Sequence, residues 1–341
     1  MESEMLLLDV VNWIEHELPI TCCTSDVFVY DDMQSQSGKS LPVIYVPFDG
    51  NKASHWDDRG QILDFLCAVC GRGKRLLDLG PGDGWPSLGV APFAAEVVGV
   101  DASWKRVEVC EGNAARLGIS NARFVHVPAG RPLPFEDESF DGAMAASCIE
   151  QTPDPKATLS EIFRVLRPGG RLRIYYEALG WYRGGRERDV WLAGIGDDAS
   201  RLIIYDRDIE GEKANQYGIT FSMSREELVP ILSGGESRPS YGNLTIGALD
   251  ALRSRIVDVR KCTLMHPSGR TLTGWLKETG FSDVLPTHSG GAFARRLYDC
   301  LPEHERPSDL EGVDAVLEPL VGIAVEMAAP IQSDPMITAV K

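Results

Sequence analysis

A glycine-rich turn between a buried strand and a helix constrains this chain more than any other feature. The segment Leu76–Gly84 reads LLDLGPGDG, and the segment Val97–Asp101 reads VVGVD. We interpret them as a hydrophobic strand, a sharp turn that favours glycine, and a second hydrophobic strand that ends in a carboxylate. With a helix between the strands, this is one β-α-β unit of a doubly wound α/β fold. The turn and the acid together predict a site for a nucleoside-containing cofactor.

Strands and helices continue to alternate along the chain. Short apolar runs predict strands, whereas apolar residues at every third or fourth position predict helices. We therefore expect a Rossmann-like α/β fold with a seven-stranded, mostly parallel sheet. The expected later strands are 123–127, 140–146, 171–179, 281–285 and 336–340. The expected helices are one that begins near Pro86, then 105–117, 159–166, 272–280 and one opened by a capping box at Ser308–Glu311.

Two regions interrupt this alternation. Residues 1–70 contain a predicted amphipathic helix, Leu7–Leu18, and two strand-like runs at 27–30 and 41–46. Residues 180–265 are rich in Gly, Arg, Asp and Ser, and we expect a partly helical insertion after the fifth strand that lies over the strand ends. The predicted parts are an N-terminal extension or cap (1–70), a cofactor-binding core (71–179), an inserted lid or substrate region (180–265) and a completion of the core sheet (266–341).

Composition narrows the choice of partners. The 341 residues carry a formal net charge of −16, which disfavours nucleic acid because an acidic surface repels phosphates. No apolar run approaches the roughly 20 residues of a membrane span, so no membrane partner is expected. Eight scattered cysteines and a start without a basic segment favour a cytoplasmic protein with reduced thiols. Cys67 and Cys70 have a metal-ligand spacing, but no second pair accompanies them; we expect burial and no metal.

The glycine spacing distinguishes between cofactors. Gly80, Gly82 and Gly84 follow a G-x-G-x-G pattern, whereas nicotinamide dehydrogenases use G-x-G-x-x-G. Asp78–Gly84 resembles the D/E-x-G-x-G-x-G motif of class I S-adenosylmethionine-dependent methyltransferases. The resemblance is to the small-molecule, type 11 branch, and it covers 75–178 well, 270–341 in patches, and neither the first 70 residues nor the insertion. It continues through Leu133–Asp141, Thr152–Pro155, Glu161–Gly170 and Leu276–Phe281.

The resemblance implies roles for individual residues on the donor side. Asp78 would orient the amino group of S-adenosylmethionine, Asp101 would hold the ribose hydroxyls, and Ala102 would lie beside the adenine. The acid that usually reads adenine aligns with Ala129, so backbone near Ala129 and Gly130 would read it instead. The three glycines would line the methionine and ribose through backbone, and Ala145, at the end of the fourth strand, would border the transferable methyl group.

The acceptor side is less determined. Glu150 and Gln151 stand where relatives often carry two histidines, so Glu150 is either a catalytic group or part of a surface loop. His55 is either an acceptor-side base or a surface or capping residue. Trp85 either packs on the N-terminal segment or contacts the cofactor.

The predicted function is methyl transfer to a small molecule by in-line displacement. The alternatives are a non-catalytic S-adenosylmethionine-binding module and a nicotinamide dehydrogenase, against which the glycine spacing argues. The acceptor and its nucleophilic atom are not readable from the sequence, and a homodimer stays open.

Overall fold

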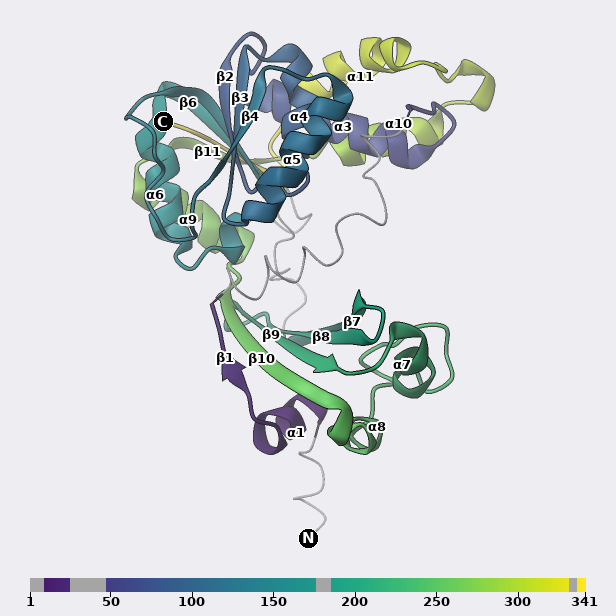
Figure 1. The fold of residues 1–341 in the computed structure, drawn as a ribbon. Coiled ribbons are helices and arrows are strands. Elements are labelled where there is room, and N and C mark those ends of the chain that lie inside the picture. The colour runs from purple at the N-terminus through teal and green to yellow at the C-terminus, as the bar shows by residue number, and fades with distance from the viewer. Residues whose placement is uncertain (1–8, 25–46, 176–184, 331–335) are drawn as a thin grey trace. The chain divides into compact units, whose positions relative to one another are not determined.

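The computed structural model describes residues 9–24, 47–175, 185–330 and 336–341, which form two compact units (Figure 1). The insertion unit combines Met1–Ser37 with Arg183–His266, and the core unit combines Gly38–Tyr182 with Pro267–Lys341. This grouping differs from the division expected from the sequence, in which 1–70 is a single segment. The two strand-like runs at 27–30 and 41–46 lie outside the described residues.

A mostly parallel sheet organises the core unit. In the described residues it has seven strands in the order β11-β12-β6-β5-β2-β3-β4. Strands β4, β3, β2, β5 and β6 run parallel, and β12 pairs antiparallel with both β6 and β11. This sheet confirms the predicted fold class. Its strands are β2 (Arg75–Leu79), β3 (Glu96–Asp101), β4 (Ala122–His126), β5 (Phe140–Ala146), β6 (Leu166–Tyr175), β11 (Ser282–Thr287) and β12 (Met336–Val340).

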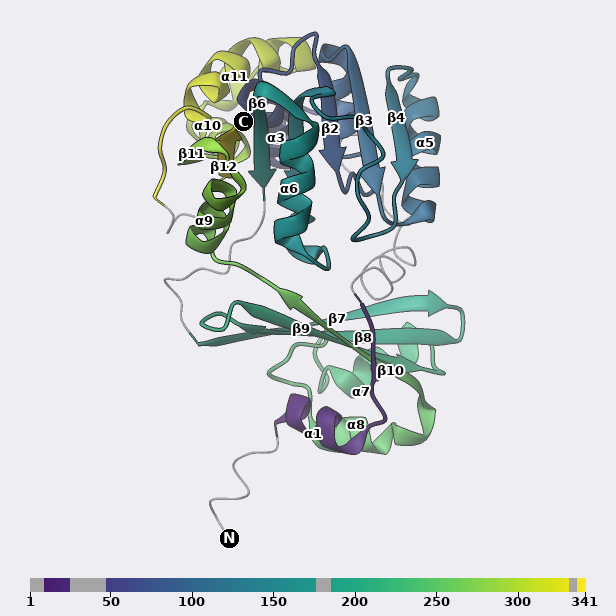
Figure 2. The same cartoon turned by 90° about the vertical axis from the view of Figure 1, so that its left-hand side faces the viewer.

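Helices cover both faces of this sheet, and Figure 2 shows α6 and α9 in front of it with α3 behind. Successive strand residues point to opposite faces; thus Leu77 packs with the α6 and α9 cluster, and Leu76 packs with the α3 and α11 cluster. The helices are α3 (Ala53–Ala68), α4 (Ser87–Val90), α5 (Trp104–Leu117), α6 (Pro155–Val165), α9 (Gly269–Thr279), α10 (Gly290–Cys300) and α11 (Leu310–Ala324), with 3-10 turns η3 (Ala91–Phe93), η4 (Ile149–Gln151) and η6 (Glu303–Glu305).

The strand order reverses between β2 and β5. The chain runs from β2 outward to β3 and β4, and then returns to β5 on the other side of β2. Leu79, near the end of β2, pairs with Ala145, near the end of β5. The loops that leave these two strands therefore start side by side. Ligands of open α/β sheets bind at such a reversal, which places the glycine turn and the loop after β5 at the expected position.

The insertion unit is built on a second sheet, of order β1-β10-β9-β8-β7 in the described residues. Helices α1, α7 and α8 pack on one face of this sheet. The expectation of a partly helical insertion understates its strands: in β10, Val257, Asp258, Val259 and Arg260 alternate apolar with charged residues, which interrupts the apolar run that would mark a strand. The elements are β1 (Thr21–Cys22), β7 (Arg186–Gly196), β8 (Ala199–Asp208), β9 (Lys213–Phe221), β10 (Ile256–Met265), α1 (Val10–Glu17), α7 (Arg225–Leu232), α8 (Ile246–Ala251) and η5 (Arg253–Arg255).

Two local expectations were wrong, and one helix was missed. The N-cap of α11 is Asp309, whose carboxylate accepts from the backbone N–H of Gly312 at 2.8 Å, and not Ser308. The helix at 290–300, α10, was not predicted from the sequence. Cys67 and Cys70 were both expected to be buried, but Cys67 is half-buried and Cys70 is exposed. Cys70 lies beyond α3, because the helix ends at Ala68. Among the described helices, none is long and apolar enough to cross a membrane.

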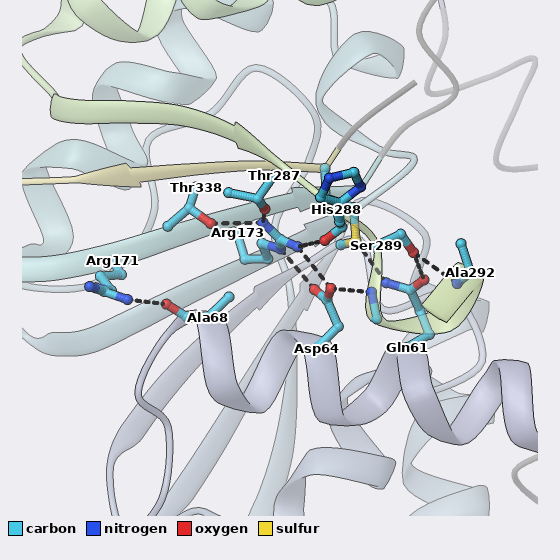
Figure 3. Close-up of polar contacts among 12 residues, drawn as sticks. Gln61, Asp64, Ala68, Arg171, Arg173, Thr287, His288, Ser289, Ala292 and Thr338 are labelled. Atoms are coloured by element: carbon cyan, nitrogen blue, oxygen red, sulfur yellow. Dashed lines mark hydrogen bonds and ion pairs between the residues drawn. The ribbon is translucent and has the colours of Figure 1, made fainter. Parts of the chain in front are cut away.

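A buried ion pair joins α3 to the sheet (Figure 3). Arg173 of β6 and Asp64 of α3 are both fully buried and form two parallel hydrogen bonds of 2.8 Å. The other guanidinium N–H groups donate to the hydroxyls of Thr287 and Thr338 and to the backbone oxygen of His288. All five donors of the arginine are thereby satisfied, and β6, β11, β12 and α3 are held at one point.

Replacing Asp64 with alanine leaves Arg173 buried without its counter-charge. We expect Asp64→Ala to lower the free energy of unfolding by about 3–5 kcal/mol, measured by urea titration of the full chain. The matched control is Glu318→Ala, which removes a pair with Arg72 whose side chains are 52% and 34% exposed; exposed pairs contribute about 0–1 kcal/mol. Equal losses in the two variants would show that the buried pair does not stabilise the fold.

Candidate functional site

The glycine turn between β2 and α4 is built from left-handed backbone. Gly80, Gly82 and Gly84 have φ angles of 69°, 61° and 105°, a region that side chains disfavour. The N–H of Gly80 donates to the backbone oxygen of Val100 at 2.8 Å, which ties the turn to β3. The sequence motif therefore follows from the backbone geometry.

Gly80 and Gly82 meet different surroundings. A Cβ atom at Gly80 would lie 2.6 Å from the Cβ of Cys148, whereas a Cβ at Gly82 would meet no heavy atom within 4 Å. The thiol of Cys148 also donates to the backbone oxygen of Leu79 at 2.9 Å. The loop after β5 therefore packs against the start of the glycine turn, and the space beside the Cα of Gly82 is open.

Asp78 lies under the turn and is fully buried. Its Oδ2 accepts hydrogen bonds from the hydroxyl of Ser87 at 2.6 Å and from the backbone N–H of Ser87 at 3.2 Å. Its Oδ1 is buried without a hydrogen-bond partner. Burial raises the pKa of this carboxyl to about 8, since water no longer stabilises the charged form. A cation bound next to Oδ1 would stabilise the ionised form of this carboxyl group.

Asp101 ends β3 beside the same turn. Its carboxylate accepts from the backbone N–H of Ser103 at 2.8 Å and from that of Gly82 at 3.3 Å. Burial raises the pKa of Asp101, and these backbone donors oppose the rise. The acid of the second strand and the glycine turn are thus brought together, as the β-α-β interpretation of the sequence requires.

The loops after β3 and β4 are also joined. The backbone N–H of Val127 donates to the oxygen of Asp101 at 3.0 Å, and Nε2 of His126 lies 3.0 Å from the oxygen of Ala102. Ala129 is half-buried, and Gly130 is exposed with a φ of 73°. Ala129 and Gly130, the candidate adenine-binding residues, thus follow shortly after the end of β4, where His126 and Val127 contact Ala102 and Asp101.

The loop after β5 carries the acceptor-side candidate. Ser147 takes a left-handed φ of 50°, and its N–H donates to the oxygen of Tyr175 at 2.7 Å. This turn leads through Cys148 into η4, where Glu150 is 7% exposed. Burial raises the pKa of Glu150 to about 7. A carboxyl that titrates near neutral pH is suited to accept a proton.

His55 and Trp85 have their own structural contacts. His55 lies in the first turn of α3, where Nδ1 accepts from the backbone N–H of Asp49 at 2.9 Å and the ring packs edge-on against Phe48. The indole N–H of Trp85 donates to Asp58 of α3 at 2.9 Å. Trp85 therefore packs on the N-terminal segment, one of the two alternatives read from the sequence, and it links α3 to the glycine turn.

Sequence reasoning missed Ser87 and Cys148. Ser87 follows the turn at the start of α4, where a hydroxyl often bonds a nearby acid, so its position carried a weak signal. Cys148 is 69 residues from the carbonyl it contacts, and no local pattern marks such a partner.

Comparison with known proteins places the core unit. Residues 77–174 match the model of the methyltransferase domain family. This segment is similar to methyltransferase domains. The match confirms the resemblance read from the glycine turn, the acid of β3 and the segments that follow them.

The methyltransferase domain has relatives of diverse kinds. The "uncharacterized methyltransferase YcgJ" of Bacillus subtilis is 34% identical over 38% of this chain and 53% of its own length. A demethylmenaquinone methyltransferase of Clavibacter sepedonicus is 39% identical over 30% of this chain and 40% of its own length. The matched segments thus span about half of the length of the first of these curated relatives and 40% of the length of the second. The solved CcbJ methyltransferase from Streptomyces caelestis aligns with a TM-score of 0.47 at 16% identity, over 92% of this chain and 93% of its own.

Alanine substitutions at Gly80 and Gly82 should reduce the stability of the fold by different amounts. Gly80→Ala forces a Cβ against Cys148, so we expect it to lower the melting temperature by more than Gly82→Ala, which bears only the cost of a left-handed alanine, about 1–2 kcal/mol. Cys148→Gly in the Gly80→Ala background should restore part of the loss. Thermal unfolding followed by circular dichroism checks this order, and equal melting temperatures for the two single variants would refute it.

Proposed function

We propose that the protein transfers a methyl group from S-adenosylmethionine to a small-molecule acceptor by direct, in-line displacement. The match of residues 77–174 to the methyltransferase domain family carries this proposal. A sulfonium methyl group is already activated, so the protein needs to align the two reactants and exclude water. Such alignment is worth about 7–11 kcal/mol of the barrier.

The donor-side residues fit this cofactor. S-adenosylmethionine brings a sulfonium and an ammonium cation, and Asp78 offers a fully buried carboxylate oxygen without a hydrogen-bond partner. Asp101 offers a carboxylate to the ribose hydroxyls beside the open backbone of Gly82. We assign the ammonium group to Asp78 and the ribose to Asp101. The backbone of the loop at Ala129 and Gly130, next to Ala102, borders the adenine, and Ala145 borders the methyl group.

Glu150 is the better of the two candidate bases. Its pKa, raised to about 7 by burial, allows it to take a proton from an acceptor that arrives as an alcohol, phenol or amine. His55 already accepts a backbone hydrogen bond from Asp49, which favours its capping role. Glu150 therefore takes the place of general base in this proposal.

The named relatives support a small-molecule acceptor. They include a 27-O-demethylrifamycin SV methyltransferase of Amycolatopsis mediterranei, 34% identical over 30% of this chain, and the demethylmenaquinone methyltransferase. The names of these two relatives indicate different acceptors, although their aligned segments are similar to each other and to this chain. We therefore assign the choice of acceptor to the parts of the chain outside these alignments, and first of all to the insertion unit. The lid role of the insertion, a homodimer and a cytoplasmic location stay predictions.

Cofactor binding is testable by calorimetry. We expect S-adenosylmethionine and S-adenosylhomocysteine both to bind, and Asp101→Ala to weaken binding roughly 10- to 100-fold because a charge-assisted hydrogen bond is lost. Asp299→Ala, at a side chain 50% exposed on α10, is the matched control and should bind as the wild type does. A wild-type protein that binds neither compound would overturn the proposed function.

The pKa of Asp78 predicts a dependence on pH. In the free protein this carboxyl stays protonated up to about pH 8, and a cation binds the ionised form. Affinity for S-adenosylmethionine should therefore rise between pH 6 and 8.5, with release of a proton, and the rise should flatten in Asp78→Asn. Calorimetry in buffers of different ionisation enthalpy measures the proton. A wild-type affinity that does not change with pH would contradict this assignment.

The same group makes a prediction for stability. Above its ordinary pKa of 3.8 the unfolded chain loses this proton, whereas the folded protein keeps it to about pH 8, so this group lowers stability as pH rises from 4 to 8. Asp78→Asn removes the effect while keeping an acceptor for Ser87. Its melting temperature should exceed that of the wild type by more at pH 8 than at pH 5. A difference that shrinks with pH would show that the carboxyl is ionised when buried.

A further inference from the structure

An exposed tryptophan lies beside the ribose-binding acid. Trp104 is the first residue of α5 and is 61% exposed. A single exposed apolar residue is common on protein surfaces and needs no special account. Trp104 differs in its position, because Asp101, whose carboxylate is assigned to the ribose, is only three residues before it.

The ring of Trp104 is held in place by its neighbours. It packs edge-to-face on His126, with ring centroids 5.4 Å apart and an interplanar angle of 87°. Nε2 of His126 in turn lies 3.0 Å from the backbone oxygen of Ala102. The residues Asp101, Ala102, His126 and Trp104 therefore form a connected cluster at the ends of β3 and β4.

The chemistry of a nucleoside places a base beside this cluster. The base is attached to the ribose carbon next to the diol. If Asp101 holds the diol, only the ribose ring separates the base from the carboxylate. The loop that follows β4 reads Val127-Pro-Ala-Gly130 and offers no side-chain hydrogen-bonding group. In the loop after β3, the hydroxyl oxygen of Ser103 already accepts from the backbone N–H of Arg106 at 3.3 Å. The exposed aromatic ring of Trp104 is therefore the side chain of these loops that we consider for the base.

We propose that Trp104, supported by His126, is the stacking platform for the adenine ring of the methyl donor. The inference rests on the proposed function, since it assumes a nucleoside at Asp101. Stacking on an aromatic side chain binds a base through its π face and needs no hydrogen-bonding side chain. It supplies the affinity that the acid replaced by Ala129 would otherwise give.

The test is the affinity of the full chain for S-adenosylhomocysteine, measured by calorimetry. Trp104→Ala should weaken binding roughly 5- to 100-fold, whereas Trp104→Phe should stay within about threefold of the wild type because a ring is kept. The matched control is Trp191→Ala, which removes a tryptophan that is 55% exposed in the insertion unit. It should bind as the wild type does, and because Trp104 is mostly exposed, the melting temperature should be unchanged in its variants.

A second readout uses fluorescence. S-adenosylhomocysteine should quench tryptophan emission in the wild type and in Trp191→Phe, and most of this quenching should disappear in Trp104→Phe. If the wild type binds and Trp104→Ala binds within twofold of it, the platform is refuted while the proposed function stands. If the wild type does not bind, the proposed function fails, and this inference fails with it.

Discussion

The buried pair of Arg173 and Asp64 connects the sheet to the helix that supports the candidate site. Arg173 comes from β6, the strand beside β5, and Asp64 comes from the middle of α3. A charge inside a protein is tolerated only when its hydrogen-bonding groups are all satisfied, and the contacts of Arg173 meet that condition. The demand for complete pairing sets where α3, β11 and β12 must lie. Asp58 of α3 is then held where it binds Trp85, next to the glycine turn.

The acids of the candidate site follow a different principle. Asp78 is as fully buried as Asp64, and Glu150 is 7% exposed. Burial raises the pKa of Asp78 and Glu150 toward neutral pH, because no arginine neutralises them. Groups in this state lower the stability of the free protein and gain from a cation or a proton. The contrast separates two kinds of buried charged group: Arg173 and Asp64 are paired within the fold, whereas we propose that Asp78 and Glu150 are paired by the methyl donor and the acceptor.

Much of the core unit was predictable because its signals are local. The strand at 140–146 and the strand at 336–340 have the predicted bounds, since short apolar runs between polar residues show them directly. Gly118 caps α5 in a left-handed conformation, as its position indicated. The insertion was harder to predict, because its strands mix apolar residues with charged and polar ones and resemble a polar linker. The helix at 290–300 was missed for a related reason: its buried face consists of Gly290, Gly291 and Ala294, which carry little hydrophobic signal.

The sequence by itself determined the local geometry of the proposed methyl-donor site: the strand, the glycine turn and the acid at Asp101 lie within one β-α-β unit, and their spacing along the chain dictates their geometry. Only the tertiary structure decided the rest. It placed Cys148 against Gly80, left one oxygen of Asp78 without a partner, buried Glu150 and set Trp104 against His126 beside Ala102. These relations join residues from different strands, and the packing of the whole sheet, rather than any local pattern, brings them together.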